Sequence, residues 1–296
     1  MSHVSVLLHE VIQGLDLKQG DSVLDGTFGG GGHSKEALKY IGPTGTLVGL
    51  DMDSAAVKRC EQIAAYSVAR MECIEANYKD AVEVLAQHNI HTIDKVMLDI
   101  GLSSFQFEES GRGFSFKKDE PLRMTFNAHP TEETMTADTI VNTWDEENIA
   151  TILWKYGEER FSRRIAKAIV EKRTEKQIET TTELAELISN TVPKRFATKI
   201  HPATKTFQAL RITVNDELGN LRTGLSRIFD AVNPGGRIAV ISFHSLEDRI
   251  VKQFFRTLKD NDEAELITKK PIVPSDEEVR ENPRSRSAKL RIIQKI

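Results

Sequence analysis

A glycine-rich segment with flanking acids is the part of this 296-residue chain best suited to bind a cofactor. Residues 25–34 read D-G-T-F-G-G-G-G-H-S and stand between a predicted strand and a predicted helix. Gly29 to Gly32 permit positive φ and a close approach of the backbone to a ligand, and the helix N-terminus offers free N–H groups. Asp51 ends the next predicted strand, where a carboxylate can accept both ribose hydroxyls of an adenosine. These features predict a cofactor that contains adenosine.

Two cofactor classes fit this pattern. NAD needs a glycine turn that receives a pyrophosphate, normally G-x-G-x-x-G. S-adenosylmethionine has no phosphate and needs an acid near the first strand to position its amino-acid end, a part that Asp25 can play. The leading acid of D-G-x-x-G-x-G favours the methyl donor, and NAD stays as the alternative. A turn without a ligand is disfavoured, because each glycine costs ~0.5–1 kcal/mol relative to alanine in regular structure.

Alternating strands and helices must position these residues. Apolar runs predict strands at 22–24, 46–50, 68–74 and 95–100, and helical spacing predicts helices at 34–40, 54–65 and 79–88. This alternation predicts βαβ units and a parallel sheet, with the loops after the strands on one ligand-binding edge. Later in the chain we expect strands at 237–243, 265–269 and 290–294, and helices at 216–232 and 246–258.

The strand and helix alternation stops after Leu102. Residues 103–130 predict a loop, and helical spacing follows up to Pro193, with a capping box at Thr180 and Glu183. The simplest assembly is a sheet domain of residues 1–105 and 215–296, with a helical insertion at 106–214.

Charge is distributed unevenly along the chain. The net charge of −4 argues against a nucleic-acid partner, but residues 151–215 carry 13 Lys and Arg against 7 Glu and no Asp, a balance of +6. Such asymmetry can build a basic face on an acidic protein. A solvated helical surface with mixed ion pairs is the alternative interpretation.

Several classes of protein are disfavoured. No apolar stretch approaches the ~20 residues that span a membrane, and the first residues lack the features of a signal peptide. Cys60 and Cys73 are the only cysteines and form no C-x-x-C pair. We therefore expect neither a disulfide nor a zinc site, and a cytoplasmic location.

Longer motifs are spread over nearly the whole chain. They read H-V-S-V-L-L-H-E-V (3–11), D-G-T-F-G-G-G-G-H-S (25–34), L-D-I-G-L-S-S (98–104), G-R-G-F-S-F (111–116), Y-G-E-E-R-F-S-R-R-I-A-K-A-I (156–169), H-P-A-T-K-T-F-Q-A-L-R-I-T-V-N-D-E-L (201–218), S-F-H-S-L-E-D-R-I-V-K (242–252) and N-P-R-S-R-S-A-K-L-R (282–291). In these segments the chain resembles the bacterial 16S rRNA cytosine-N4 methyltransferases of the RsmH/MraW type. The resemblance implies an α/β fold, a class I S-adenosylmethionine-dependent methyltransferase (Rossmann-like) sheet with an inserted α-helical domain. It also implies methylation of the N4 amine of a cytidine in 16S rRNA or the small ribosomal subunit.

The resemblance also implies site residues. Carried over motif by motif, the cofactor contacts are Gly31, Gly32, His33, Asp51, Tyr78, Asp99 and Gln106. Tyr78 can pack on the adenine. One segment departs from the family: 121–127 reads P-L-R-M-T-F-N where the family usually has P-L-D-M-R-M-D. Arg123, Thr125 and Asn127 in that segment bear on the exact substrate or on turnover.

Methylation of cytosine N4 needs the amine aligned with the methyl group and an acceptor for its N–H, because the lone pair is delocalised. Asp99, at the end of the fourth predicted strand, is the candidate base, although it could instead hold the cofactor or order the turn through Ser103 and Ser104. His244 is a second catalytic candidate. A capping role for its segment, with Ser242 or Ser245 as N-cap, is the alternative.

RNA contacts are expected from basic residues of the insertion: Arg160, Arg163, Arg164, Lys194, Arg195 and Lys199. Arg163 or Arg164 could instead pair with Glu158 or Glu159 within a helix. Loop aromatics could stack on an unpaired base or belong to the core; they are Phe105, Phe107, Phe114, Phe116 and Phe126. An RNA-binding protein with an inactive methyltransferase fold and an NAD-dependent oxidoreductase are the alternatives, and a homodimer is left open.

Overall fold

The computed structural model describes residues 5–101, 110–128, 130–193 and 201–296. It divides into two compact units, one of Met1–Gly101 with Leu218–Ile296 and one of Leu102–Glu217. The expected site residues Gln106, Lys194, Arg195 and Lys199 lie outside the described residues, as do Phe105 and Phe107.

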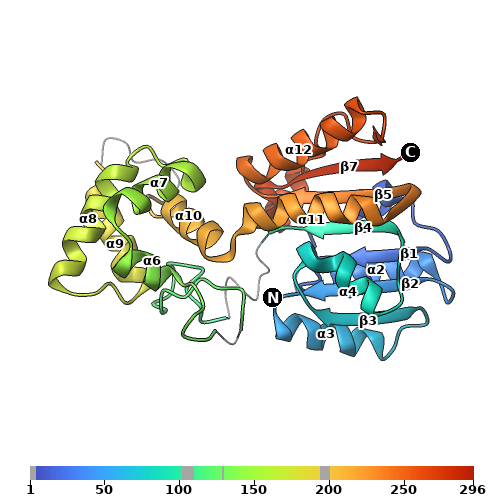
Figure 1. The fold of residues 1–296 in the computed structure, drawn as a ribbon, viewed down its shortest axis with the longest axis horizontal. Coiled ribbons are helices and arrows are strands. Elements are labelled where there is room, and N and C mark those ends of the chain that lie inside the picture. Colours follow the sequence, from blue (N-terminus) through green and yellow to red (C-terminus); the bar gives the residue numbers. More distant parts are fainter. Residues whose placement is uncertain (1–4, 102–109, 129, 194–200) are drawn as a thin grey trace. The chain divides into compact units, whose positions relative to one another are not determined.

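A seven-stranded sheet forms the centre of the first unit, with the strand order β3-β2-β1-β4-β5-β7-β6 (Figure 1). The strands are β1 Ser22–Asp25, β2 Thr46–Asp51, β3 Arg70–Glu75, β4 Ile93–Asp99, β5 Val232–Ser242, β6 Ala264–Leu266 and β7 Lys289–Lys295. This order, with helices between the strands, is the class I methyltransferase arrangement, so the expected fold class is confirmed.

The sheet is mixed rather than wholly parallel. β1 to β5 pair in parallel, but β7 runs antiparallel to both β5 and β6. An antiparallel neighbour needs no crossover helix of the kind that joins parallel strands. The strand predicted at 68–74 also begins late, at Arg70, which leaves Val68 on the surface, 75% exposed.

The helices of this unit follow the predicted alternation. They are α2 Gly32–Ile41, α3 Ser54–Ala64, the short η1 Tyr78–Asp80, α4 Ala81–Gln87, α11 Glu217–Ala231 and α12 Ser245–Asp260. Three further elements were not predicted: α1 Leu8–Leu15, α13 Asp276–Glu281 and η3 Pro283–Ser287. Leu15 of α1 is buried with Ile41 of α2 and Leu290 of β7 in one apolar cluster. The packing of α1 therefore closes one face of the sheet.

The second unit is helical and has its own core. Its described helices are α6 Ala137–Thr143, α7 Glu146–Gly157, α8 Ser162–Glu175, α9 Thr181–Thr191 and α10 Thr204–Asn215. The predicted capping box of Thr180 and Glu183 begins α9 and is confirmed. Segment 110–128 contains no regular helix or strand, yet it supplies Leu122 and Met124 to the core.

The described loop aromatics belong to this core. Phe114 is buried and stacks on Phe126 with 5.6 Å between ring centroids, and Phe116 meets Phe207 edge to face at 5.0 Å. For these three rings the core interpretation holds, because each packs against apolar neighbours within its own unit.

The cysteines correct an expectation. Cys60 of α3 and Cys73 of β3 form a disulfide, with 5.7 Å between their Cα atoms. The prediction of no disulfide was wrong because it used spacing along the chain, whereas the packing of α3 on β3 brings together residues 13 positions apart. No helix of the described part of the chain is long and apolar enough to cross a membrane.

Candidate active site

The carboxyl ends of the parallel strands bring three aspartates to one edge of the sheet. Asp25 ends β1, Asp51 ends β2 and Asp99 ends β4. The register sets Asp25 between Gly49 and Met97 of the neighbouring strands. This is the edge at which open α/β sheets bind ligands.

The glycine-rich loop is anchored to these strands through Asp25. Its carboxylate accepts from the Ser34 hydroxyl at 2.6 Å and from the Thr27 backbone N–H at 3.2 Å. The Thr27 hydroxyl oxygen in turn accepts from the backbone N–H of Asp99 at 2.6 Å. Asp25 is buried, with 3% of its surface exposed, and its hydrogen bonds hold the loop in place.

Two glycines let neighbouring side chains pack closely against the start of α2. Gly31 is the N-cap with φ 73° and makes no side-chain capping bond. A Cβ on Gly31 would overlap the Phe28 ring, and one on Gly32 would overlap the Ser5 hydroxyl. Because no side chain caps this end of the helix, the first N–H groups of α2 can serve a ligand, as helix N-termini do for anionic groups.

His33 fastens the N-terminal segment beside this loop. Its Nε2 lies 3.0 Å from the Val6 carbonyl oxygen, so this nitrogen donates to it. Burial lowers the pKa of His33, which disfavours the protonated ring. This hydrogen bond ties the start of α2 to the N-terminal segment.

Asp51 is oriented by the backbone. One carboxylate oxygen accepts from Gly29 N–H at 2.8 Å and the other from Asp53 N–H at 2.9 Å. Each oxygen has a further lone pair, so the group can still accept from two hydroxyls. The side chain is partly exposed, and burial raises its pKa.

Tyr78 is held where β3 leaves the sheet. It begins η1, and the Asn77 side chain caps this turn by accepting from Lys79 N–H at 3.0 Å. A Cβ on Gly224 of α11 would lie 2.7 Å from the Tyr78 ring, so the ring rests directly on that glycine. The ring is half-buried, with surface left for a further contact.

Asp99 has the chemistry of a base poised near neutral pH. Burial raises its pKa to about 6, and the negative charge of Glu247 adds to the rise, while a bond from Gly101 N–H at 3.4 Å opposes it. Burial also raises the pKa of Asp25 to about 6. Among the described residues, neither these two nor Asp51 forms an ion pair with Lys or Arg. The edge therefore carries negative charge without ion-pair partners among these residues, and only the more distant charge of Arg59 acts on Asp51 to lower its pKa.

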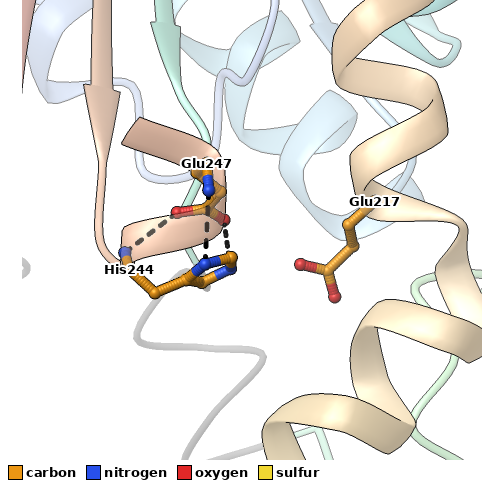
Figure 2. A group of neighbouring side chains, drawn as sticks. All are labelled: Glu217, His244 and Glu247. Carbon is orange, nitrogen blue, oxygen red and sulfur yellow. Dashed lines mark hydrogen bonds and ion pairs between the residues drawn. The ribbon is translucent and has the colours of Figure 1, made fainter. Parts of the chain in front are cut away.

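His244 caps a helix. It is the N-cap of α12, where its Nδ1 accepts from Glu247 N–H at 3.4 Å (Figure 2). The buried Glu247 carboxylate accepts from Phe243 and His244 N–H at 2.8 and 3.2 Å. Nε2 lies 3.0 Å from Glu247 but without hydrogen-bond geometry. The cap is thus His244 itself, not Ser242 or Ser245.

Some basic residues of the helical unit lie on its surface, and others form ion pairs within it. Arg160, Arg163 and Arg164 are exposed around the start of α8. Glu159 is buried and accepts from Phe161 N–H at 2.8 Å, so its carboxylate turns inward.

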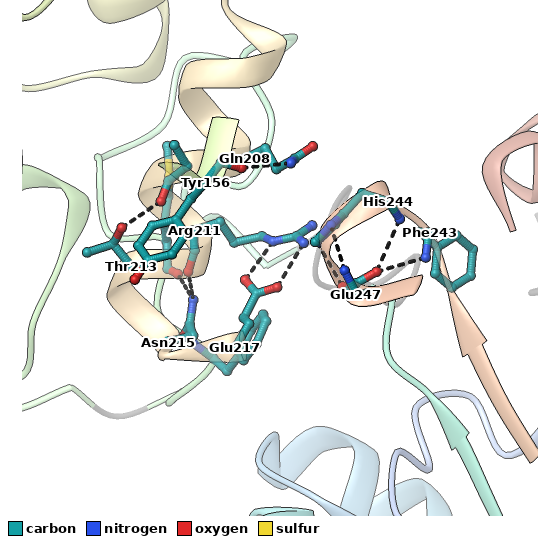
Figure 3. Close-up of polar contacts among 12 residues, drawn as sticks. Tyr156, Gln208, Arg211, Thr213, Asn215, Glu217, Phe243, His244 and Glu247 are labelled. Carbon is teal, nitrogen blue, oxygen red and sulfur yellow. Dashed lines mark hydrogen bonds and ion pairs between the residues drawn. The ribbon is translucent and has the colours of Figure 1, made fainter. Parts of the chain in front are cut away.

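Arg211 is used internally instead. It makes a two-pronged ion pair with Glu217, at 2.7 and 2.9 Å (Figure 3). Segment 121–127, which departs from the family pattern, is bound to the end of α10. Asn215, the last residue of that helix, donates to the Met124 carbonyl and accepts from Phe126 N–H, both at 2.8 Å. Its Arg123 and Asn127 side chains remain exposed.

Thr27, Ser34 and Glu247 are site residues that our sequence reasoning did not single out. Each acts on another site residue, Thr27 and Ser34 by hydrogen bonds and Glu247 by its charge. The signal for the first two lay within the glycine-rich motif itself. Nothing local signalled that Glu247 would lie near Asp99.

Comparison with known proteins agrees with this geometry. The family model described as the MraW methylase family matches residues 1–296. The chain is 44% identical over 310 residues to the ribosomal RNA small subunit methyltransferase H of Clostridium botulinum (strain Kyoto / Type A2), covering 99% of both chains. It is 45% identical over 294 residues to the protein of that name from Deinococcus deserti, covering 99% of this chain and 93% of the relative. The protein of the same name from Deinococcus radiodurans is 46% identical over 291 residues, with 98% and 89% covered.

Proposed function

The chain belongs to the MraW methylase family, and from that premise we propose that it transfers a methyl group from S-adenosylmethionine to the N4 amine of a cytidine in 16S rRNA. The relatives named ribosomal RNA small subunit methyltransferase H support the small ribosomal subunit as the partner. We place this activity in the cytoplasm, where that subunit is assembled. The observation that carries the proposal is a base of raised pKa beside a glycine loop at the ligand-binding edge of the sheet.

The residues present fit S-adenosylmethionine. Asp51 has lone pairs left for the ribose hydroxyls, and the half-buried Tyr78 offers a ring face for adenine. The start of α2 at Gly31 and Gly32 has no side-chain cap and can offer N–H groups to the carboxylate end, and Asp25 positions that loop. When bound, the cofactor supplies an electrophilic methyl group on a cationic sulfur. The unpaired carboxylates at this edge favour a cation.

Asp99 completes the reaction in this proposal. Methyl transfer from a bound cofactor would release S-adenosylhomocysteine and would make the N4 amine acidic, so that N4 has to lose a proton. The Asp99 carboxylate accepts the proton that N4 loses. A base with a pKa of about 6 is ionised at pH 7 yet more basic than an ordinary aspartate. His244 stays a second catalytic candidate, as a residue that contacts the target cytosine.

We further propose that the helical unit recognises the RNA. Arg160, Arg163 and Arg164 are exposed cations of the kind that contact phosphates. The undescribed Lys194, Arg195 and Lys199 lie in the same unit along the chain and extend this expectation.

The decisive experiment measures incorporation of labelled methyl groups into purified small subunits that lack the modification, with the product nucleoside identified by mass spectrometry. Free 16S rRNA is assayed beside the assembled subunit. We expect N4-methylcytidine with the parent protein and ~100- to 10,000-fold slower formation of it with Asp99→Asn. Binding of S-adenosylhomocysteine without incorporation into either RNA would reduce the chain to an RNA-binding protein with an inactive fold.

A further inference from the structure

A groove lies between α2 and α3 on the sheet unit, and the reaction proposed above leaves it unused. Its volume is about 650 Å³, which is within the ~300–1,000 Å³ of typical ligand sites. It runs from Gly30, in the cofactor loop, to Val68, beyond the end of α3. On α2 the lining residues end at Lys39, seven residues beyond Gly32, so the groove extends ~10 Å along this helix at 1.5 Å per residue.

The charge of this groove has one sign. Lys35, Lys39 and Arg59 line it, and no acidic side chain does. Lys35 is exposed, and Lys39 is exposed with an ion pair to Glu36 at 2.6 Å, a surface pair worth little in free energy. Arg59 donates to the Gly29 carbonyl at 3.1 Å and so supports the cofactor loop. The groove therefore suits a polyanion.

An exposed aromatic ring stands beside these cations. Tyr66 is 92% exposed and Val68 is 75% exposed, while Leu38 and Ile63 line the groove more deeply. An aromatic platform among cations is the combination that binds single-stranded nucleic acid, because any base can stack on the ring while the cations contact phosphates. A single exposed tyrosine needs no explanation, but this one lines a cationic groove.

We propose that the α2–α3 groove binds a single-stranded segment of the substrate RNA away from the target base, with Tyr66 stacked on a base and Lys35 and Lys39 on flanking phosphates. This deepens the proposed function and rests on its assignment of RNA as substrate. A second copy of the chain fits less well. A twofold contact would set the same patch against itself and bring the three cations together.

The test compares two charge-reversal variants of the whole protein. The first is Lys35→Glu/Lys39→Glu with Tyr66→Ala. The matched control is Lys252→Glu/Lys259→Glu on α12, which changes the net charge equally and likewise pairs one exposed lysine with one in a surface ion pair, here Lys259 with Asp260 at 3.5 Å. The probe is a fluorescein-labelled single-stranded RNA of about 16 nucleotides, the upper end of common site sizes. Binding is followed by anisotropy between 50 and 200 mM salt, the span over which phosphate contacts are felt.

We expect the groove variant to bind the probe at least tenfold more weakly than the control. Its slope of log affinity against log salt should be shallower by about 1.4, because two contacts are lost at about 0.7 each. Tyr66→Ala alone should weaken binding about fivefold or more. Affinity for S-adenosylhomocysteine and the melting temperature should match those of the parent protein, since all three side chains are exposed.

Equal RNA affinity in the groove variant and the control would overturn the inference. So would loss of a dimer by sedimentation with RNA affinity unchanged, which would make the groove an interface between copies. The binding assay needs no methyl transfer. A parent protein that binds RNA through the groove but methylates no small subunit would contradict the proposed function and leave this inference standing.

Discussion

The two ends of the parallel strands, the amino edge and the carboxyl edge of the sheet, differ in how their charged side chains are paired. At the amino edge, the Asp94 carboxylate accepts from Ser22 N–H and from the Asn233 amide, both at 2.8 Å. The buried Lys95 lies 4.0 Å from Asp21, so cation and anion share that edge. Burial raises the pKa of carboxylates at both edges, but at the amino edge the charge of Lys95 opposes the rise for Asp21, whereas at the carboxyl edge Asp25 and Asp99 have no cation as an ion-pair partner among the described residues.

This difference separates stability from function within one sheet. Compensated polar groups add to stability, whereas buried charge without a counter-ion costs free energy. Uncompensated carboxylates persist at active sites because their perturbed pKa values serve a reaction or a ligand. The Ser34 hydroxyl and backbone N–H groups, rather than ion pairs with cations, orient Asp25 and Asp51. Their charge therefore remains available to a bound cation.

The largest expected effect tests the carboxyl edge. Asp99→Asn removes the proton acceptor with little change of shape, so kcat for methyl transfer should fall by ~100- to 10,000-fold. Affinity for S-adenosylhomocysteine, measured by calorimetry, should stay within a few fold of the parent value. Normal turnover at saturating cofactor would show that Asp99 is not the base. The carboxyl edge would then have no catalytic role to set against the stabilising role of the amino edge.

The amino edge should respond in stability instead. Asp94→Ala leaves Ser22 N–H and the Asn233 amide without their acceptor, which should lower the free energy of unfolding by ~2–4 kcal/mol. Urea denaturation measures this, and kcat per folded molecule should be unchanged. A selective loss of kcat in this variant would mean that the two edges do not divide their roles.

The pH dependence of stability sharpens the comparison. The folded-state pKa of Asp99 is about 6, above its ordinary 3.8. The folded state therefore binds the proton more tightly, and this contribution to stability is lost as the pH rises from about 4 to about 6. Asp99→Asn should avoid this loss and become more stable than the parent above pH 6, by up to ~3 kcal/mol at 1.36 kcal/mol per pKa unit.

The same ionisation should have the opposite effect on activity. For the parent protein, kcat/KM should rise about tenfold per pH unit up to about pH 6 and then level off, as Asp99 loses its proton. The stability prediction is checked by urea denaturation of the parent protein and of Asp99→Asn at pH 4, 6 and 8. A stability difference that stays constant over this range would place the Asp99 pKa near its ordinary value.

The smallest effect concerns Asp51. Asp51→Ala should weaken cofactor binding by ~1.5–3 kcal/mol, the scale for hydrogen bonds to a charged group. Asp53→Ala is the matched control, since Asp53 caps α3 by accepting from Ala55 N–H at 3.0 Å but should cost ~1 kcal/mol of stability rather than affinity. If both variants bind the cofactor alike, Asp51 acts only by holding Gly29.

Local patterns in the sequence were enough to predict the elements that carry the site. The strand ends at Asp25, Asp51 and Asp99, the glycine-rich turn and the Thr180–Glu183 cap each depend on residues within about ten positions of one another. Hydrophobic periodicity, glycine conformation and helix capping act over that range. The family motifs then implied a class I methyltransferase sheet with a helical insertion, which no local pattern contains.

Only the tertiary structure decided how distant residues meet. The Cys60–Cys73 disulfide, the antiparallel β7, the charge of Glu247 near Asp99 and the groove between α2 and α3 all join residues from different elements. The core position of Phe114 is of the same kind. A residue's burial, its pKa and its partners depend on what packs against it. Periodicity along one chain shows which face is apolar, but not which other face will cover it.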